Sequence, residues 1–153
     1  MSSRPRTGTP RGTPRSLRPT REARPSRRSA STTGTEGAAL HPALDTDLAF
    51  LILRKGMNAG VDSYSAFVEA DGKTTTGLAA LLRARGARRV FTCGLATDYC
   101  VAFSALDARA AGFETFVIDD ACRAIDANNS LADAWARMSA AGVRRIGSRD
   151  ILG

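Results

Sequence analysis

The sequence predicts an α/β fold of three layers (α/β/α), in which a parallel sheet lies between two layers of helices. Short apolar runs of the buried-strand type alternate with stretches of helical periodicity, beginning and ending with a strand. Apolar strands that are joined by helices are typical of parallel sheets covered on both faces. The 153 residues, of which 43% are hydrophobic, suffice for one domain core and a tail.

Four short segments are the predicted strands. The first covers residues 48–54 (LAFLILR), and the others cover residues 90–93, 113–118 and 143–146. Each run is long enough for a strand and too short for an ordinary helix. Cys93 lies inside the second run, so we expect its side chain in the core.

Three helices are predicted between these strands. The first runs from Thr76 to Gly86, the second starts at Thr97 or Asp98, and the third runs from Asn129 or Ser130 to Gly142. The second helix presents small side chains at helical spacing, which suits close packing on a sheet. We interpret Asp98 as the cap of this helix rather than as a catalytic acid.

Residues 1–33 differ in composition from the rest of the chain. They contain nine Arg, one acidic residue and five of the six Pro, with only two large apolar residues. Such a segment cannot bury enough surface to offset its conformational entropy, so we predict a disordered tail followed by one domain over residues 34–153. Three origins are open: an extension without a role, a targeting segment, or the product of a frameshift or misplaced start.

The net charge of +7 belongs to this tail, because residues 1–33 carry +8 and the remaining residues carry −1. The neutral body and the lack of aromatic residues in the tail argue against nucleic-acid binding. A non-catalytic module with a polyanion-binding tail is one alternative function. No run of 18 apolar residues and no signal-peptide core are present, and three unpaired Cys fit a reducing compartment, so we expect a cytoplasmic protein without a membrane segment.

Two candidate reactive residues follow neighbouring predicted strands. In open parallel sheets, ligands bind at the carboxyl ends of the strands. Lys55 follows the first strand and Cys100 lies in the first helical turn after the second, so we expect both side chains at one edge of the sheet. The helix dipole and the ammonium group favour a thiolate at Cys100, which would act as a nucleophile beside backbone N–H groups that form an oxyanion hole. The alternative is a buried, inert Cys100.

The remaining candidate ligands do not form a metal-binding pattern. Cys122 follows Asp119 and Asp120 in a predicted loop, and we expect it to be structural. His41 is the only His, and it precedes Pro42 in a predicted loop. No two Cys have the spacing of a zinc site, so the sequence predicts no metal centre.

Several segments together resemble a known family. Residues 94–101 (GLATDYCV) resemble the nucleophile motif of the nicotinamidases, within the isochorismatase-like cysteine hydrolases. Residues 55–67 resemble the lysine strand and substrate loop of that family, and further matches lie at residues 35–42, 119–123 and 138–142. The resemblance extends from about Gly34 to the end of the chain. A thiol in this motif favours an amidase over the true isochorismatases, which lack it.

The resemblance implies hydrolysis of nicotinamide to nicotinate and ammonia through a Cys thioester, a step of NAD salvage. The implied site residues are Cys100 and Lys55 as catalytic residues, the N–H groups of Ala96 and Cys100 as the oxyanion hole, and Tyr64 and Phe67 beside the substrate. Either aromatic side chain could instead pack the loop. The resemblance also implies a cis peptide between Leu95 and Ala96. A related amidohydrolase that acts on another small amide, such as a carbamoyl or ureido compound, is an alternative.

Three features of the resembled family have no counterpart in this sequence. They are a first strand ending in a general-base Asp, a divalent-metal site (zinc, iron or manganese) built from Asp and His, and a Trp-Pro segment that stacks on the pyridine ring. We therefore expect the C-terminal portion of such an enzyme, without a cofactor of its own. Loss of a general base costs about 10²–10⁴-fold in rate, so we expect weak or no turnover. An exposed sheet edge favours self-association into a homo-oligomer.

Overall fold

The computed structural model describes residues 34, 36–57 and 61–151, so the predicted disordered tail lies outside the described residues. The chain divides into two compact units, Met1–Asp47 and Leu48–Gly153. The described part of the first unit contains a short 3-10 turn over Glu36–Ala38 and is largely exposed. The predicted start of the domain at residue 34 stays a prediction.

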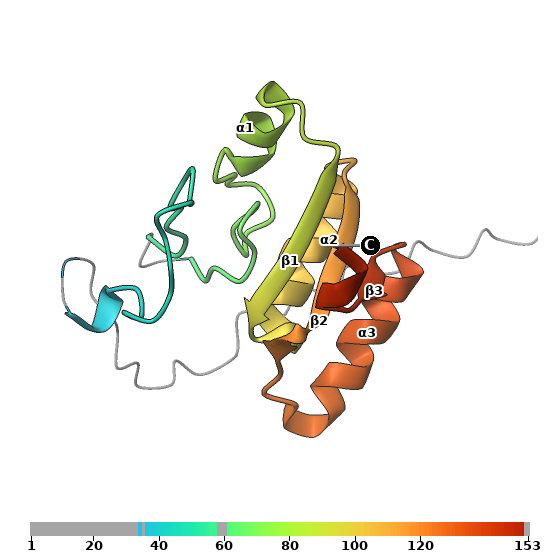
Figure 1. Cartoon of the computed structure of the whole chain (residues 1–153). Helices are drawn as coiled ribbons and strands as arrows, with labels where there is room; N and C mark the ends of the chain where they lie inside the picture. Colours follow the sequence, from blue (N-terminus) through green and yellow to red (C-terminus); the bar gives the residue numbers. More distant parts are fainter. Residues whose placement is uncertain (1–33, 35, 58–60, 152–153) are drawn as a thin grey trace, which may run out of the picture. The chain divides into compact units, whose positions relative to one another are not determined.

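A parallel sheet of three strands forms the centre of the second unit, within the part of the chain that the structure describes (Figure 1). Its strands, in spatial order, are β1 (Arg89–Leu95), β2 (Glu114–Arg123) and β3 (Arg144–Ile146). Both neighbouring pairs run parallel. The predicted α/β class with a parallel sheet is therefore confirmed.

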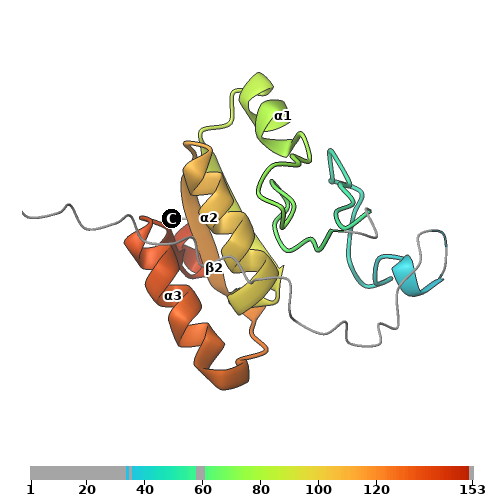
Figure 2. The same ribbon diagram turned by 180° about the vertical axis from the view of Figure 1, so that it is seen from behind.

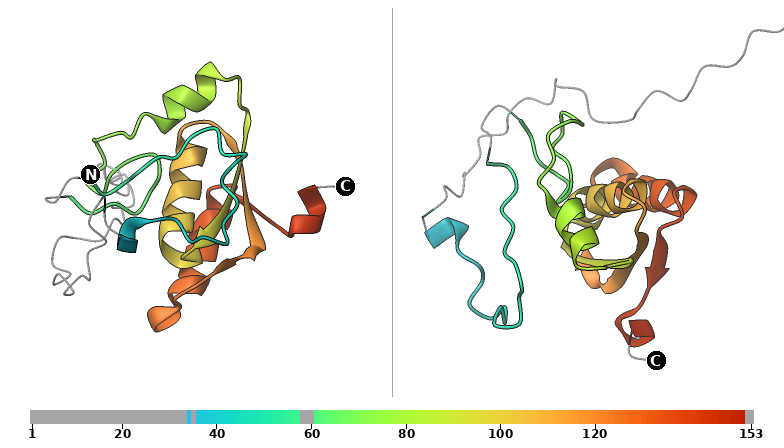
Figure 3. Two further views of the ribbon diagram at one scale, coloured as in Figure 1. Left: turned by 60° about the vertical axis from the view of Figure 1, so that its left-hand side comes forward. Right: turned by 90° about the horizontal axis from the view of Figure 1, so that it is seen from above.

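The three predicted helices are all present. They are α1 (Leu78–Ala84), α2 (Ala102–Ala110) and α3 (Ser130–Ala140), and a π-helical turn over Thr97–Val101 leads directly into α2. Helices α2 and α3 lie side by side on one face of the sheet (Figure 2 and Figure 3). Helix α2 contacts β1 and β2, whereas α3 contacts β3.

Small side chains on α2 allow this close packing. Ala102, Ala105 and Ala108 are fully buried, so the backbone of the helix approaches the sheet without large side chains between them. Ala134 and Met138 of α3 are also fully buried and belong to the same core as Ala102 and Ala105. The small face that the sequence predicts for α2 is thus the face that packs.

The predicted strand over residues 48–54 is wrong. These residues have no regular secondary structure, and their apolar side chains are exposed: Leu48 is 93% exposed and Phe50 66% exposed. A strand requires a neighbour that accepts and donates its backbone hydrogen bonds, and the sheet of the described residues ends at β1. The apolar run was therefore not sufficient to predict a strand.

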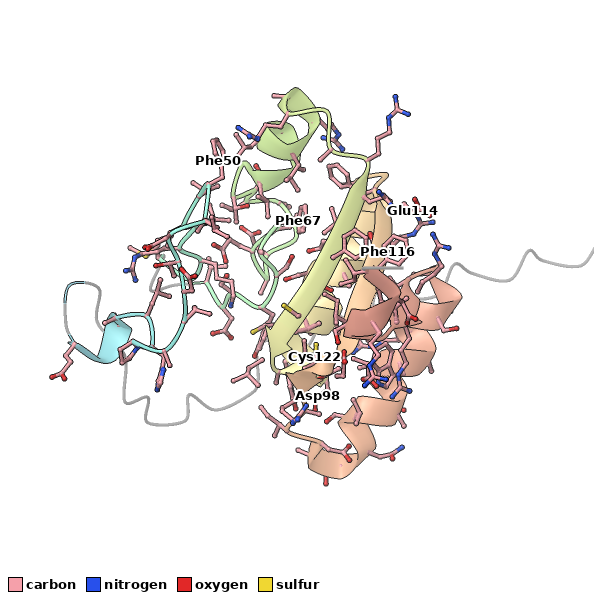
Figure 4. The ribbon with its side chains drawn as sticks, viewed as in Figure 1. Phe50, Phe67, Asp98, Glu114, Phe116 and Cys122 are labelled. Carbon is pink, nitrogen blue, oxygen red and sulfur yellow. The ribbon has the colours of Figure 1, made fainter. Side chains whose placement is uncertain are left out.

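The expectation that Cys93 lies in the core is also wrong, because Cys93 is exposed. Exposure alternates along β1, and Cys93 shares its outward face with Phe91. On that face the ring of Phe91 stacks on Phe116 of β2 at a centroid distance of 4.6 Å, and the guanidinium of Arg144 lies 4.3 Å from the Phe116 ring centre. Arg144 also pairs with Glu114 (Figure 4). Helix α2 covers the opposite face of β1.

Strand β2 is longer than predicted and contains residues that were expected in a loop. Asp119, Asp120 and Cys122 all lie within it. Cys122 is 4% exposed and packs in the core with α2 and α3, as expected of a structural residue. Burial raises the pKa of the Cys122 thiol, which keeps it protonated.

Candidate active site

Cys100 lies where β1 turns into a helix. Strand β1 ends at Leu95, and the peptide between Leu95 and Ala96 is cis, as the resemblance implies. The π-helical turn over Thr97–Val101 follows, and its first carbonyl, that of Ala96, accepts hydrogen bonds from the N–H groups of Tyr99 and Val101 at 3.1 Å each. Cys100 is half-buried in this turn, so its thiol remains partly accessible.

The ammonium group of Lys55 contacts this thiol. Its Nζ lies 3.5 Å from Sγ of Cys100 and donates a second hydrogen bond to the carbonyl of Ser63 at 2.8 Å. The sequence predicts that these two side chains meet, and the geometry agrees even though Lys55 does not follow a strand. A positive charge in this position stabilises a thiolate electrostatically.

Asp98 has a different role from the one predicted for it. The cap position of the helical turn is occupied by Ala96, and no side chain caps it. The carboxylate of Asp98 instead accepts hydrogen bonds from the backbone of Ile125 and Asp126 and from the hydroxyl of Ser130. Burial by itself would raise the pKa of Asp98, but these hydrogen bonds outweigh it and leave the pKa below its ordinary value of 3.8.

The two predicted aromatic residues occupy different environments. The Tyr64 ring stacks on Phe103 with a centroid distance of 5.4 Å and lies 6.3 Å from Tyr99, so it faces the helix that carries Cys100. Phe67 does not join this group, because it is 4% exposed and packs against Ala108 and Phe113. Its contact with a substrate stays a prediction.

Sequence reasoning did not identify Tyr99 and Phe103 as site residues. They are four residues apart and therefore lie on one helix face, a spacing that could have indicated an aromatic surface beside the nucleophile. Ser104 was also missed: its hydroxyl accepts a hydrogen bond from the N–H of Ala66 at 2.9 Å. This contact attaches the loop that contains Tyr64 to α2.

An apolar cavity of about 460 Å³ lies next to Lys55. Its other lining residues come from the segment around Phe50 (Figure 4), from α1 and its C-cap Arg85, and from Ala66, and Cys100 is not among them. Two of the lining residues contact each other, because the guanidinium of Arg85 lies 3.6 Å from the centre of the Phe50 ring. The cavity therefore adjoins the Lys55 side of the pair rather than the thiol.

The described residues do not fit a metal centre. Residues 34, 36–57 and 61–151 contain no group of three or more His, Cys, Asp and Glu side chains that could hold an ion. The Nδ1 atom of His41 accepts a hydrogen bond from the N–H of Ala43, in an exposed turn. No helix in the same residues is both long and apolar enough to cross a membrane.

Comparison with known proteins identifies the family of this chain. The family described as isochorismatase domain matches residues 10–150, which is most of the sequence. The chain therefore belongs to the isochorismatase domain family. A curated relative from Acinetobacter baylyi, a nicotinamidase, is 57% identical over 119 residues, which cover 78% of this chain and 56% of the relative.

Two solved structures are similar as well. A nicotinamidase and pyrazinamidase of Acinetobacter baumannii has a TM-score of 0.76 and 53% identity, covering 77% of this chain and 57% of that one. A protein of L. infantum in complex with nicotinate has a TM-score of 0.72 and 45% identity, covering 76% and 58%. The chain spans about half the length of the curated relatives that it matches.

Proposed function

We propose that the chain belongs to an amide hydrolase of the nicotinamidase type and that Cys100 is its nucleophile. The contact of 3.5 Å between Lys55 Nζ and Cys100 Sγ carries this proposal, because it places a cation against a thiol in a strand-to-helix turn. The similarity to a nicotinamidase at 57% identity supports nicotinamide as the substrate.

In the proposed reaction, the Cys100 thiolate attacks the carboxamide carbon of nicotinamide. The amide nitrogen then takes a proton, the C–N bond breaks, and ammonia leaves. The resulting nicotinoyl thioester reacts with water, which releases nicotinate and restores the thiol. Lys55 stabilises the thiolate before attack, and its ammonium group can supply a proton to the leaving amine.

The backbone N–H groups of Ala96 and Cys100 are proposed to bind the oxyanion that forms during attack. Both belong to the turn between β1 and α2, where N–H groups at the start of a helix have no partner in the preceding turn. Tyr64 is proposed to form an aromatic wall beside the substrate, since its ring faces the helix that carries Cys100. The burial of Phe67 favours a packing role for that residue.

Slow turnover is part of the proposal. Asp98 is the acidic residue nearest to Cys100 along the sequence. Both of its carboxylate oxygens accept hydrogen bonds, from Ile125, Asp126 and Ser130, so it is poorly suited to accept the thiol proton. We propose that none of the described residues acts as a general base for Cys100, so that the rate depends on the thiolate that Lys55 stabilises. The cost of a missing general base is about 10²–10⁴-fold.

The test is ammonia release from nicotinamide by the purified chain, compared with Cys100→Ala. We expect slow release that the substitution abolishes. Equal release by the variant would refute the nucleophile. Release at the ordinary enzymatic rates of about 1–10³ s⁻¹ would instead refute the absence of a base.

Pyrazinamide deserves a parallel assay, because the similar Acinetobacter baumannii enzyme is described as acting on both amides. Both substrates place a carboxamide on a flat nitrogen heterocycle, so the same aromatic wall would accept either. Release from pyrazinamide alone would indicate the alternative of a related amidohydrolase with another substrate. Self-association and a cytoplasmic location stay predictions.

A further inference from the structure

Asp98 connects the nucleophile turn to a distant part of the chain. It lies two residues before Cys100 and is 2% exposed. Its Oδ1 accepts the N–H of Ile125 at 3.1 Å, and its Oδ2 accepts the N–H of Asp126 at 2.8 Å and the hydroxyl of Ser130 at 2.5 Å. Ile125 and Asp126 belong to the connection between β2 and α3, which lies beside the carboxyl end of β1 (Figure 4), and Ser130 is the first residue of α3.

This connection has an unusual backbone. Asp126, Asn128 and Asn129 have φ angles of 52°, 55° and 64°, in the left-handed region that residues other than Gly rarely adopt. Asp98 binds the connection at its first residues and again at Ser130, where α3 begins. The Asp98 carboxylate therefore holds both ends of a connection that is only partly regular, with a short 3-10 turn over Ala127–Asn129.

Apolar contacts with α3 also hold the turn over Thr97–Val101. Val101, next to Cys100, packs in the core with Ala134 and Met138 of α3, so the apolar side of this turn also depends on the placement of α3. The hydrogen bonds that stabilise the charged carboxylate make Asp98 a fixed anion rather than a proton acceptor. Asp98 thus supplies the polar part of an attachment whose apolar part is the core.

We infer that Asp98 is a positioning residue: by binding the connection between β2 and α3, it holds the turn over Thr97–Val101 so that Sγ of Cys100 meets Nζ of Lys55. This inference rests on the proposed role of Cys100 as the nucleophile. It gives Asp98 a role that acts through the backbone of the turn, and it assigns the connection over residues 124–129 a role in the reactivity of Cys100.

The experiment measures the rate at which iodoacetamide alkylates each of the three cysteines, resolved by peptide mass spectrometry. Cys93 is exposed, Cys122 is buried, and Cys100 is the residue in question. Cys122 therefore reports unfolding, and Cys93 reports the general reactivity of an accessible thiol in the same molecule. No substrate is needed, so the readout is independent of hydrolysis.

Asp98→Asn should slow alkylation of Cys100 by about tenfold or more, since small displacements of a reacting group have large effects on rate. The rates at Cys93 and Cys122 should not change. The matched control is Asp120→Asn, because the Asp120 carboxylate accepts the N–H of Ser148 at 2.8 Å and its hydroxyl at 2.6 Å. This control should leave the Cys100 rate within about twofold.

A second pair of variants covers the case in which Asp98→Asn unfolds the chain. Ser130→Val removes the hydroxyl that binds Asp98, whereas Ser130→Thr keeps it at a β-branched residue of similar size. Slower alkylation of Cys100 in the valine variant alone supports the inference. Equal Cys100 rates in this pair, or an unchanged rate in a folded Asp98→Asn protein, would overturn it. A chain that passes this test but does not hydrolyse nicotinamide would refute the proposed function alone.

Discussion

Met138→Ala tests whether α3 packs as the structure shows behind the nucleophile turn. Met138 is completely shielded from solvent, and it is the largest completely buried side chain of the described residues. Truncation of a buried Met to Ala costs about 2–5 kcal/mol. Its core neighbours Val101, Ala102 and Ala105 are small and cannot readily fill the space, so we expect about 3 kcal/mol or more.

The matched control is Met57→Ala, because Met57 is 60% exposed. This variant should change the free energy of unfolding by no more than about 0.5 kcal/mol. Urea denaturation followed by circular dichroism measures both variants. The free energy of unfolding falls by about 1–3 kcal/mol per M of urea. Division of the expected loss of about 3 kcal/mol by this slope gives an unfolding midpoint that is lower by about 1 M or more in the Met138 variant. Equal midpoints in the two variants would contradict the packing of α3.

Two further outcomes follow from the site. Lys55→Met should slow alkylation of Cys100 by about fivefold, because a partly exposed ion pair contributes on the order of 1 kcal/mol. Lys73→Met serves as the control, and equal rates in the two variants would contradict the Lys55 contact. Burial alone would raise the pKa of Asp98, but its hydrogen bonds have the larger effect, so the pKa in the folded state lies below the ordinary value of 3.8. The carboxylate therefore stabilises the fold at pH values above 3.8, and this contribution is lost as the pH falls through the lower folded-state pKa. Asp98→Asn should therefore flatten the acid side of a plot of unfolding free energy against pH, and an unchanged slope would contradict the assignment.

The sequence predicted the sheet and its helices because periodicity reports burial directly. The leucines of α1 and the small residues of α2 recur at helical spacing, and the apolar residues near the start of β2 are buried. The expectation that Lys55 and Cys100 meet agrees with their contact of 3.5 Å, although the strand expected before Lys55 is not present. These predictions depend on local pattern and on topology alone.

The errors concern information that local pattern does not contain. Residues 48–54 are apolar, but a strand also needs a neighbour, and hydropathy does not reveal whether one is present. Cys93 lies in a strand, but the sequence does not show which face of that strand a helix covers. Asp98 resembles a helix cap because a cap and a long-range bridge use the same carboxylate; its hydrogen-bond donors are 27 to 32 residues away along the chain.

The most direct test of the central claim is to detect the covalent intermediate. The purified chain is mixed with nicotinamide, quenched in acid, and digested, and the peptide that contains Cys93 and Cys100 is sequenced by mass spectrometry. We predict a nicotinoyl thioester on Cys100 that is absent from Cys100→Ser and reduced in Lys55→Met. A nicotinoyl group on Cys93, or ammonia release that persists in Cys100→Ser, would contradict the account.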